Sequence, residues 1–249
     1  MVDYTLYSLI AKVGDDDEAG LFSPHVWKTV LDCKYLGLPF KTVGKSFAQI
    51  PGEFSEQVGR AVQVPTIKCG EEYVNESWVI SEYLENTHGT AGKSLYGGSA
   101  AGKRFCKFIE LWTYSTFADE FRPILYPVVY SHMDSASQSV FKNVIWGDDT
   151  PKWKAATARL ADPEWLERQF EMTRKRMKLL ESFLAASDGP FLMGQEVSHA
   201  DFSVSGAYAW CRMHKDMDQA VWRHHSLPKL GEWLDAMLQS GLVETRRLK

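Results

Sequence analysis

The chain has 249 residues, of which 45% are hydrophobic and 24% charged, and its formal net charge of −4 at pH 7 argues against a nucleic-acid partner. No stretch approaches the roughly 20 apolar residues of a membrane span, and the N-terminus lacks the form of a signal peptide, so we expect a cytoplasmic protein of two domains. The four cysteines are scattered and form no C-x-x-C motif, so no redox dithiol and no bound metal are expected.

The first predicted elements are a strand, a polar loop and a helix. Residues 4–10 mix aromatic and aliphatic side chains, as a strand does, and an acidic loop follows at positions 13–20. Ser23 is a favoured N-cap and Pro24 a favoured first helical residue, and apolar residues then recur at helical spacing as far as Gly37. Ser23 is therefore expected at the N-terminus of a helix.

A proline turn and a short strand pair precede the next helix. An X-Pro bond adopts the cis form at a cost of about 0.5–1 kcal/mol, so a cis Pro65 is expected to leave the N–H and C=O of Val64 turned outward. The strand pair occupies residues 66–74, and Glu76 and Ser77 open the helix after it. The N–H groups of a helix start suit a carboxylate, and Glu76 suits an ammonium group. The pattern predicts a grip on the end of an α-amino acid, and the alternative is a hairpin and a capped helix without a ligand.

Turn-forming residues at positions 86–94 mark the boundary between a domain at 1–90 and another at 95–249. The second domain shows helical periodicity and no strand alternation. Its helices are predicted around three sets of apolar positions: Phe105, Phe108, Ile109, Trp112 and Thr116; Leu166, Phe170, Met177, Leu180 and Leu184; and Leu230, Trp233, Leu234 and Met237. Pro123 and Pro127 are expected to end or kink the first of these helices.

Another helix of this domain is predicted to begin at Ser198. Asp201 stands at the third helical position, so the two residues form a capping box, and its loss would cost on the order of 1 kcal/mol. A metal site at His199-x-Asp201 is the alternative. It carries little weight because Asp201 is needed by the cap and no further ligands stand at a suitable spacing.

These motifs resemble the glutathione transferase superfamily. Its V-P and E/Q-S elements grip glutathione in a thioredoxin-like domain, and an S/T-x-x-D box occupies the same place in its helical domain. The resemblance spans nearly the whole chain and implies an α+β fold, with a thioredoxin-like domain before an all-helical one, and a homodimer. The Ser23-Pro24-x-Val26-Trp27 segment looks more like bacterial lignin β-etherases and the etherase-related fungal FuA class than like the tyrosine-dependent animal classes, which implies a serine-type enzyme.

The resemblance implies that Ser23 activates the sulfur of glutathione, the co-substrate. A free thiol has a pKa of about 8.5, and lowering it by two units needs about 2.7 kcal/mol of preferential thiolate stabilisation. A hydroxyl donor and the N–H groups of a helix start supply effects of this size. The alternative is that Ser23 is a helix cap and nothing more.

The glutathione-binding residues implied by the resemblance fall into three groups. The cysteinyl part would be held by Gln63, Val64 and Pro65. The γ-glutamyl end would be held by Glu76 and Ser77. The glycyl carboxylate would be held by Lys45 or another residue of the loop at positions 41–52.

Aromatic residues are the candidates for the hydrophobic-substrate pocket: Phe22, Trp27, Tyr114, Phe117 and Phe121. Core packing is the alternative for aromatics, and it is the expected role of the stripe that includes Phe108. Two segments that shape this pocket depart from the family pattern: the acidic loop at 15–18 and the stretch at 128–163, which reads as irregular.

Three functions are open. The first is a transferase that conjugates or reduces apolar or aromatic electrophiles, as in detoxification or peroxide reduction, and extends to the cleavage of aryl ethers. The second is a ligandin-like module that carries aromatic small molecules such as phenolics, with incidental catalysis. The third, an interaction protein that kept the fold and lost the chemistry, is disfavoured by the intact glutathione pattern.

Overall fold

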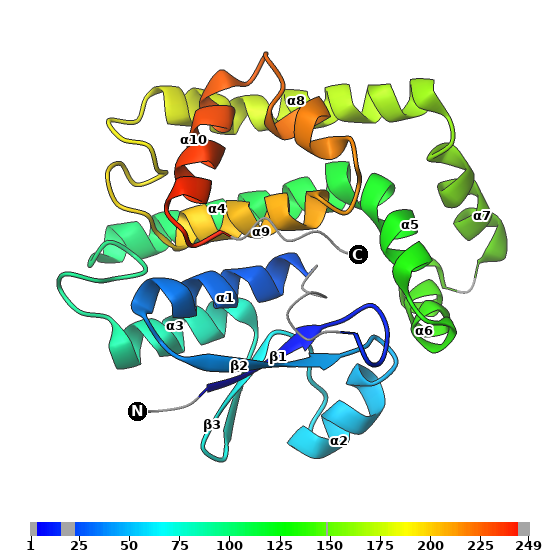
Figure 1. Ribbon diagram of the computed structural model, residues 1–249, viewed down its shortest axis with the longest axis horizontal. Helices are drawn as coiled ribbons and strands as arrows, with labels where there is room; N and C mark the ends of the chain where they lie inside the picture. Colours follow the sequence, from blue (N-terminus) through cyan, green and yellow to red (C-terminus); the bar gives the residue numbers. More distant parts are fainter. Residues whose placement is uncertain (1–3, 16–22, 148, 244–249) are drawn as a thin grey trace.

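A small mixed sheet with its helices forms one side of the molecule, and a larger layer of helices covers it (Figure 1). The computed structural model describes residues 4–15, 23–147 and 149–243. Helices α1 (Pro24–Leu36) and α3 (Ser77–His88) lie between the sheet and the helical layer. The predicted α+β class, with a small mixed-sheet domain before a helical one, is confirmed.

The sheet has four strands in the order β2-β1-β3-β4. The strands are β1 (Tyr4–Leu9), β2 (Phe40–Lys45), β3 (Thr66–Cys69) and β4 (Glu72–Asn75). Strand β2 runs parallel to β1, whereas β3 runs antiparallel to both β1 and β4. Strand β2 corrects the expectation of a loop at positions 41–52. Strand β2 pairs along its length with β1, which is distant in sequence, from Phe40 opposite Tyr4 to Lys45 opposite Leu9. Local sequence does not reveal such a partner.

Two short elements follow β2 and lead to the proline turn: a π-helical turn, Ile50–Phe54, and helix α2 (Ser55–Val58). The backbone then returns to the sheet at β3.

Helix α1 is buried on all sides. Ser23 is its N-cap and Pro24 its first residue, and Gly37 ends it in the left-handed conformation with φ of 73°. The eight residues from Val26 to Cys33 are all buried, because the sheet lies on one side and the helical layer on the other (Figure 1). The N-terminus of this helix is therefore held at the junction of the two domains.

Helix α9 (His199–Cys211) is the centre of the helical domain, and it packs against α1 and against two other helices of that domain. A Cβ atom at Gly206 would lie 2.3 Å from the carbonyl oxygen of Pro24, so this close approach requires glycine. The predicted capping box is present at the helix start. The N–H and the hydroxyl of Ser198 both donate to Oδ2 of Asp201, at 2.9 and 3.0 Å.

The remaining helices are α4 (Ala100–Thr116), α5 (Arg122–His132), α6 (Ser135–Trp146), α7 (Thr150–Arg159), α8 (Pro163–Ala185) and α10 (Pro228–Gln239), with π-helical turns at Phe117–Phe121 and Asp218–Trp222. Helix α4 gives way to a π-helical turn just before Pro123, and α5 contains Pro127, so the break predicted from the two prolines is confirmed. No helix within the described ranges is long and apolar enough to cross a membrane.

Residues 128–163 are largely helical, which corrects the expectation of an irregular stretch. Helices α6 and α7 begin at aspartate N-caps. Asp134 accepts a hydrogen bond from the Ser137 N–H at 2.8 Å, and Asp149 accepts one from the Lys152 N–H at 3.0 Å. Helix α7 buries none of its residues, so it lacks the apolar periodicity by which a helix is recognised in sequence.

The buried face of α4 agrees in part with the predicted stripe. Phe108 was expected inside and is 60% exposed. The buried face instead contains Cys106, Ile109, Glu110 and Thr113. Ile109 and Thr116 of the predicted stripe are therefore buried, and Phe108 is misplaced because polar residues occupy part of the buried face.

Candidate active site

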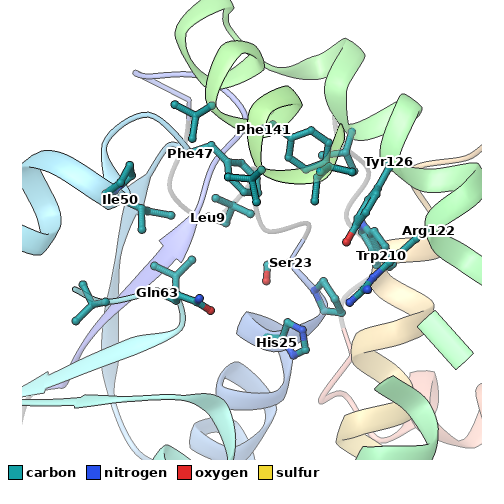
Figure 2. Close-up of a pocket in the computed structure, with 18 of the residues that line it drawn as sticks. Leu9, Ser23, His25, Phe47, Ile50, Gln63, Arg122, Tyr126, Phe141 and Trp210 are labelled. Carbon is teal, nitrogen blue, oxygen red and sulfur yellow. The ribbon is translucent and has the colours of Figure 1, made fainter. Parts of the chain in front are cut away.

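Two adjoining cavities lie at the N-terminus of α1, and Figure 2 shows residues that line the first of them. One, of about 520 Å³, has mostly apolar walls, and we call it the apolar cavity. The other, of about 390 Å³, is lined by Asn75, Glu76, Ser77 and several charged side chains, and we call it the polar cavity. Four residues line both cavities and so mark their junction: His25, Gln63, Val64 and Arg122.

Ser23 lines the apolar cavity and is 6% exposed. Its Oγ accepts a long hydrogen bond, 3.4 Å, from the N–H of Val26 in the first turn of α1. A hydroxyl has one proton to donate in addition to its acceptor sites, so the cap leaves the Ser23 O–H available to the cavity. The capping role and a donor role are therefore compatible.

The Val64-Pro65 peptide bond is cis, as predicted. The turn is held by Asn75, whose Nδ2 donates to the carbonyl oxygens of Gln63 at 2.7 Å and of Pro65 at 3.1 Å. Within the described residues, the N–H and C=O of Val64 have no hydrogen-bond partner. A half-buried backbone pair without partners, at the junction of two cavities, is ready to bind an extended peptide group.

Glu76 and Ser77 open α3 and line the polar cavity, as expected. Glu76 has φ of 78° and ψ of 123°, and it is the one non-glycine residue with positive φ in the described part of the chain. Such a conformation costs on the order of 1–3 kcal/mol and is concentrated at functional sites. The exposed carboxylate of Glu76 and the free N–H groups of the first turn of α3 face the same cavity.

A buried charge cluster forms the far wall of the polar cavity. Lys28 of α1 and Glu110 of α4 are 5% and 8% exposed, and their Nζ and Oε1 atoms are 2.7 Å apart. The Nζ of Lys107 lies 2.6 Å from the other oxygen of Glu110 and 4.4 Å from the ring centre of Trp78. Two ammonium groups thus share one carboxylate.

The pKa values of this cluster follow from burial and pairing. Burial lowers the pKa of the Lys28 ammonium, which the nearby Glu110 carboxylate opposes. Burial would raise the pKa of Glu110, but the attraction of Lys28 and Lys107 outweighs it and lowers the pKa to about 2. Glu110 is therefore ionised throughout the physiological range.

His25, the second helical residue of α1, also lies at the junction of the cavities. Burial, with a smaller contribution from the charge of Lys28, lowers its pKa to about 3. The pKa of a free thiol, about 8.5, lies some 5.5 units higher, so transfer of its proton to His25 would cost roughly 7.5 kcal/mol. His25 is therefore a neutral wall and not a base for a thiol.

The other predicted site residues are placed as follows. Lys45 lies outside both cavity linings, and its Nζ pairs with Oε1 of Glu53 at 2.6 Å. Tyr114 lines the polar cavity. Trp27 and Phe121 are 4% and 1% exposed and belong to the core, so core packing is the role that the structure gives them.

Two of the predicted pocket residues are not placed. Phe22 and the side chain of Phe117 lie outside the described residues. Among those that are described, no group of three or more His, Cys, Asp or Glu residues is arranged to hold a metal ion.

Several lining residues were missed in the sequence. In the apolar cavity they come from β1, the segment after β2, α5, α6 and α9: Leu9, Phe47, Ile50, Val129, Val140, Phe141, Val144, Ile145 and Trp210. The apolar spacing of Val140, Phe141 and Val144 is helical and is the signal that could have identified α6. For Lys28 and Glu110, the signal is a charge on the buried face of a helix.

Comparisons with known proteins agree with this geometry. Residues 22–87 match the family model of the glutathione S-transferase N-terminal domain, and residues 105–240 match that of the C-terminal domain. A glutathione S-transferase of Ceriporiopsis subvermispora, solved in complex with glutathione, has a TM-score of 0.74 at 17% identity over 97% of this chain and 99% of its own.

Two other solved structures extend the likeness. Glutathione transferase GSTFuA3 of Phanerochaete chrysosporium has a TM-score of 0.76 at 19% identity, covering 97% of each chain. The β-etherase LigF of Sphingobium sp. strain SYK-6 has a TM-score of 0.63 at 20% identity, covering 94% of each. At these identities the structures are similar in fold.

Proposed function

Because this chain belongs to the glutathione S-transferase family, we propose that it is a serine-type glutathione transferase that joins glutathione to apolar or aromatic electrophiles. One observation carries the proposal. The Ser23 hydroxyl at the start of α1, the unpaired backbone of Val64 and the acidic opening of α3 at Glu76 all line two cavities that meet. This arrangement gives a tripeptide thiol and an apolar partner one common point of contact.

In this proposal glutathione spans the polar cavity. The N–H and C=O of Val64 bind the cysteinyl backbone, and Glu76 binds the ammonium group of the γ-glutamyl end. Its α-carboxylate meets the Ser77 hydroxyl and the first N–H groups of α3. The second ammonium group of the Lys28–Glu110–Lys107 cluster adds a favourable positive charge. Lys45 stays our prediction for the glycyl carboxylate, and this requires its ammonium group to exchange Glu53 for the ligand.

The reaction follows from the position of the sulfur. The Ser23 O–H and the N-terminus of α1 stabilise the thiolate, and the thiol proton passes to solvent because His25 cannot hold it. The thiolate sulfur attacks an electrophilic carbon in the apolar cavity. A C–S bond forms, and the bond to the leaving group breaks with its electron pair on that group. A phenolate leaving group makes the same step an aryl-ether cleavage.

The test is the pKa of bound glutathione. Retention on glutathione-agarose and a dissociation constant of about 10 µM to 1 mM are expected of a transferase. The Ser23→Ala variant loses a hydrogen bond to a charged group, worth about 1.5–3 kcal/mol, so the bound thiol pKa rises by about 1–2 units while binding changes little. The thiolate ultraviolet absorbance as a function of pH reports the shift.

Ser55 provides a matched control in the same cavity. Its hydroxyl already donates to the carbonyl oxygen of Ile50 at 2.8 Å, so Ser55→Ala is expected to leave the thiol pKa unchanged. No binding at millimolar glutathione refutes the proposal. If the thiol pKa and the activity of Ser23→Ala are both unchanged while aromatic ligands still bind, Ser23 is only a cap and the ligandin-like function replaces catalysis.

We also expect a homodimer. Exposed apolar side chains on α4 and α8, among them Phe108, Leu111, Leu179 and Phe183, support this expectation. Phe105 and Phe183 stack at 5.3 Å between ring centres, so these two helices present their apolar residues side by side.

A further inference from the structure

Arg122 is the first residue of α5 and lines both cavities. It is half-buried, and its guanidinium group lies 5.1 Å from the ring centre of Tyr114 and 5.6 Å from that of Tyr126. Figure 2 shows Arg122 and Tyr126 reaching with their polar ends toward the space in front of Ser23. The two rings orient the planar guanidinium group, which then presents its N–H fork to the cavity.

No carboxylate of the described residues neutralises this group. Arg168, Arg174, Arg176 and Arg223 all form ion pairs with Asp or Glu, whereas Arg122 forms none within that part of the chain. The described lining of the apolar cavity contains no Asp, Glu or Lys. Arg122 is therefore the charged side chain of that lining, because burial keeps His25 neutral.

A half-buried guanidinium group without a counterion attracts an anion with a planar head, such as a carboxylate or a sulfonate, which it binds in a bidentate manner. The rest of the cavity is apolar and suits a hydrocarbon or aromatic body, with Val129, Phe141 and Ile145 in its walls. One molecule that satisfies both requirements has an aromatic body and an anionic head.

We propose that the second substrate of this enzyme is an aromatic electrophile that carries an anionic group, and that Arg122 binds that group and so sets the specificity. The inference rests on the proposed transferase function and names its substrate class. With 4-chloro-3-nitrobenzoate as an example, the thiolate sulfur bonds to the carbon that bears chlorine, the C–Cl bond breaks and chloride leaves with the electron pair. The carboxylate meanwhile stays on Arg122.

The first experiment measures binding and needs no turnover. The probes are 8-anilinonaphthalene-1-sulfonate and N-phenyl-1-naphthylamine, which share an aromatic body and differ by the sulfonate, and fluorescence titration gives both affinities with and without glutathione. The wild type is expected to prefer the sulfonate, and Arg122→Gln is expected to lose about ten- to a hundredfold of that preference. Arg122→Lys keeps the positive charge but lacks the paired N–H groups of the guanidinium, so it should retain part of the preference for the sulfonate.

A charge control separates the local effect from a change in net charge. Arg168 lies on α8 outside both cavities and pairs with Glu164 at 3.7 Å, so Arg168→Gln should keep the full preference. The inference is overturned if the wild type shows no preference for the sulfonate, or if Arg122→Gln retains it.

The second experiment measures turnover of 4-chloro-3-nitrobenzoate and 4-chloro-3-nitrobenzamide with glutathione. For each protein, the kcat/KM for the benzoate is divided by that for the benzamide. This ratio is expected to be at least tenfold higher in the wild type than in Arg122→Gln. An equal loss for both electrophiles with a raised thiol pKa means that Arg122 acts on the thiolate, and overturns the inference. If neither electrophile reacts while the sulfonate preference is intact, the transferase function fails and the anion site stands.

Discussion

Glu110 of the helical domain pairs with Lys28 of α1 at the wall of the polar cavity, and its neutralisation tests the stability argument most directly. Glu110→Gln keeps the shape of the side chain and leaves Lys28, 5% exposed, without its carboxylate. At 2.7 Å and an effective dielectric constant of 20, the attraction between two unit charges is about 6 kcal/mol, most of which offsets desolvation. Removing one partner of such a buried pair costs about 3–5 kcal/mol. For a chain of this length that lowers Tm by roughly 6–20 °C.

The three members of the cluster should differ in a fixed order. Lys28→Met costs less than Glu110→Gln, because Glu110 keeps Lys107 at 2.6 Å. Lys107→Met costs about 1 kcal/mol or less, because the Lys107 side chain is 40% exposed. The double variant with Lys28→Met and Glu110→Leu leaves no buried charge behind and should be more stable than Glu110→Gln alone.

The pH dependence gives an independent reading. The pKa of Glu110 is lowered from 4.5 to about 2, so its ionisation stabilises the fold above pH 4.5 and this stability is lost as the pH falls toward 2. The shift of about 2.5 units corresponds to about 3 kcal/mol. Urea unfolding should therefore show a smaller difference in the free energy of unfolding between wild type and Glu110→Gln at pH 3 than at pH 7. A cost under 1 kcal/mol at pH 7, or an equal cost for Lys107→Met, would refute the reasoning.

Two further variants test the ends of the site. Glu76→Gly should raise the free energy of unfolding by about 1 kcal/mol, because glycine adopts φ of 78° without strain. The same variant should weaken glutathione binding more than it lowers kcat. Unchanged glutathione affinity in isothermal titration would make Glu76 a helix-start residue only. Asp201→Ala should cost about 3 kcal/mol or more, above the 1 kcal/mol expected of a cap alone, because Oδ1 also accepts from the Leu192 N–H and the Trp233 indole, both at 2.9 Å. Thermal unfolding beside Ser198→Ala, which removes one hydroxyl, measures the difference, and a loss of glutathione affinity at full stability would contradict the structural role.

Local signals explain which elements could be predicted. The cap and first residue of α1, the cis bond at Pro65 and the capping box at Asp201 each depend on a few neighbouring residues, and each is present. Strand β2 depends on pairing with β1, and the exposed helix α7 depends on its aspartate cap more than on apolar spacing. Neither has a strong local pattern of its own.

The residues of the candidate site also differ in whether a local motif identifies them. The backbone of Val64 and the turn into α3 at Glu76 are local motifs and could be found in sequence. The charged and aromatic walls are brought together only by packing between α1, α4 and α5, so local sequence does not predict that Glu110 and Arg122 line the site. Trp27 and Phe121 show the opposite error, since aromatic residues near a site are still mostly core.

The burial of α1 on both of its long faces bears on how this protein can exchange parts with its relatives. Lys28 and Asp32 both lie on α1, yet their partners, Glu110 at 2.7 Å and His199 at 2.7 Å, belong to the helical domain. A chimera that took its first 90 residues from another family member would import α1 without those partners. Recombination at the sequence boundary is therefore expected to yield folded, active proteins only when the matching positions of α4 and α9 are transferred with it.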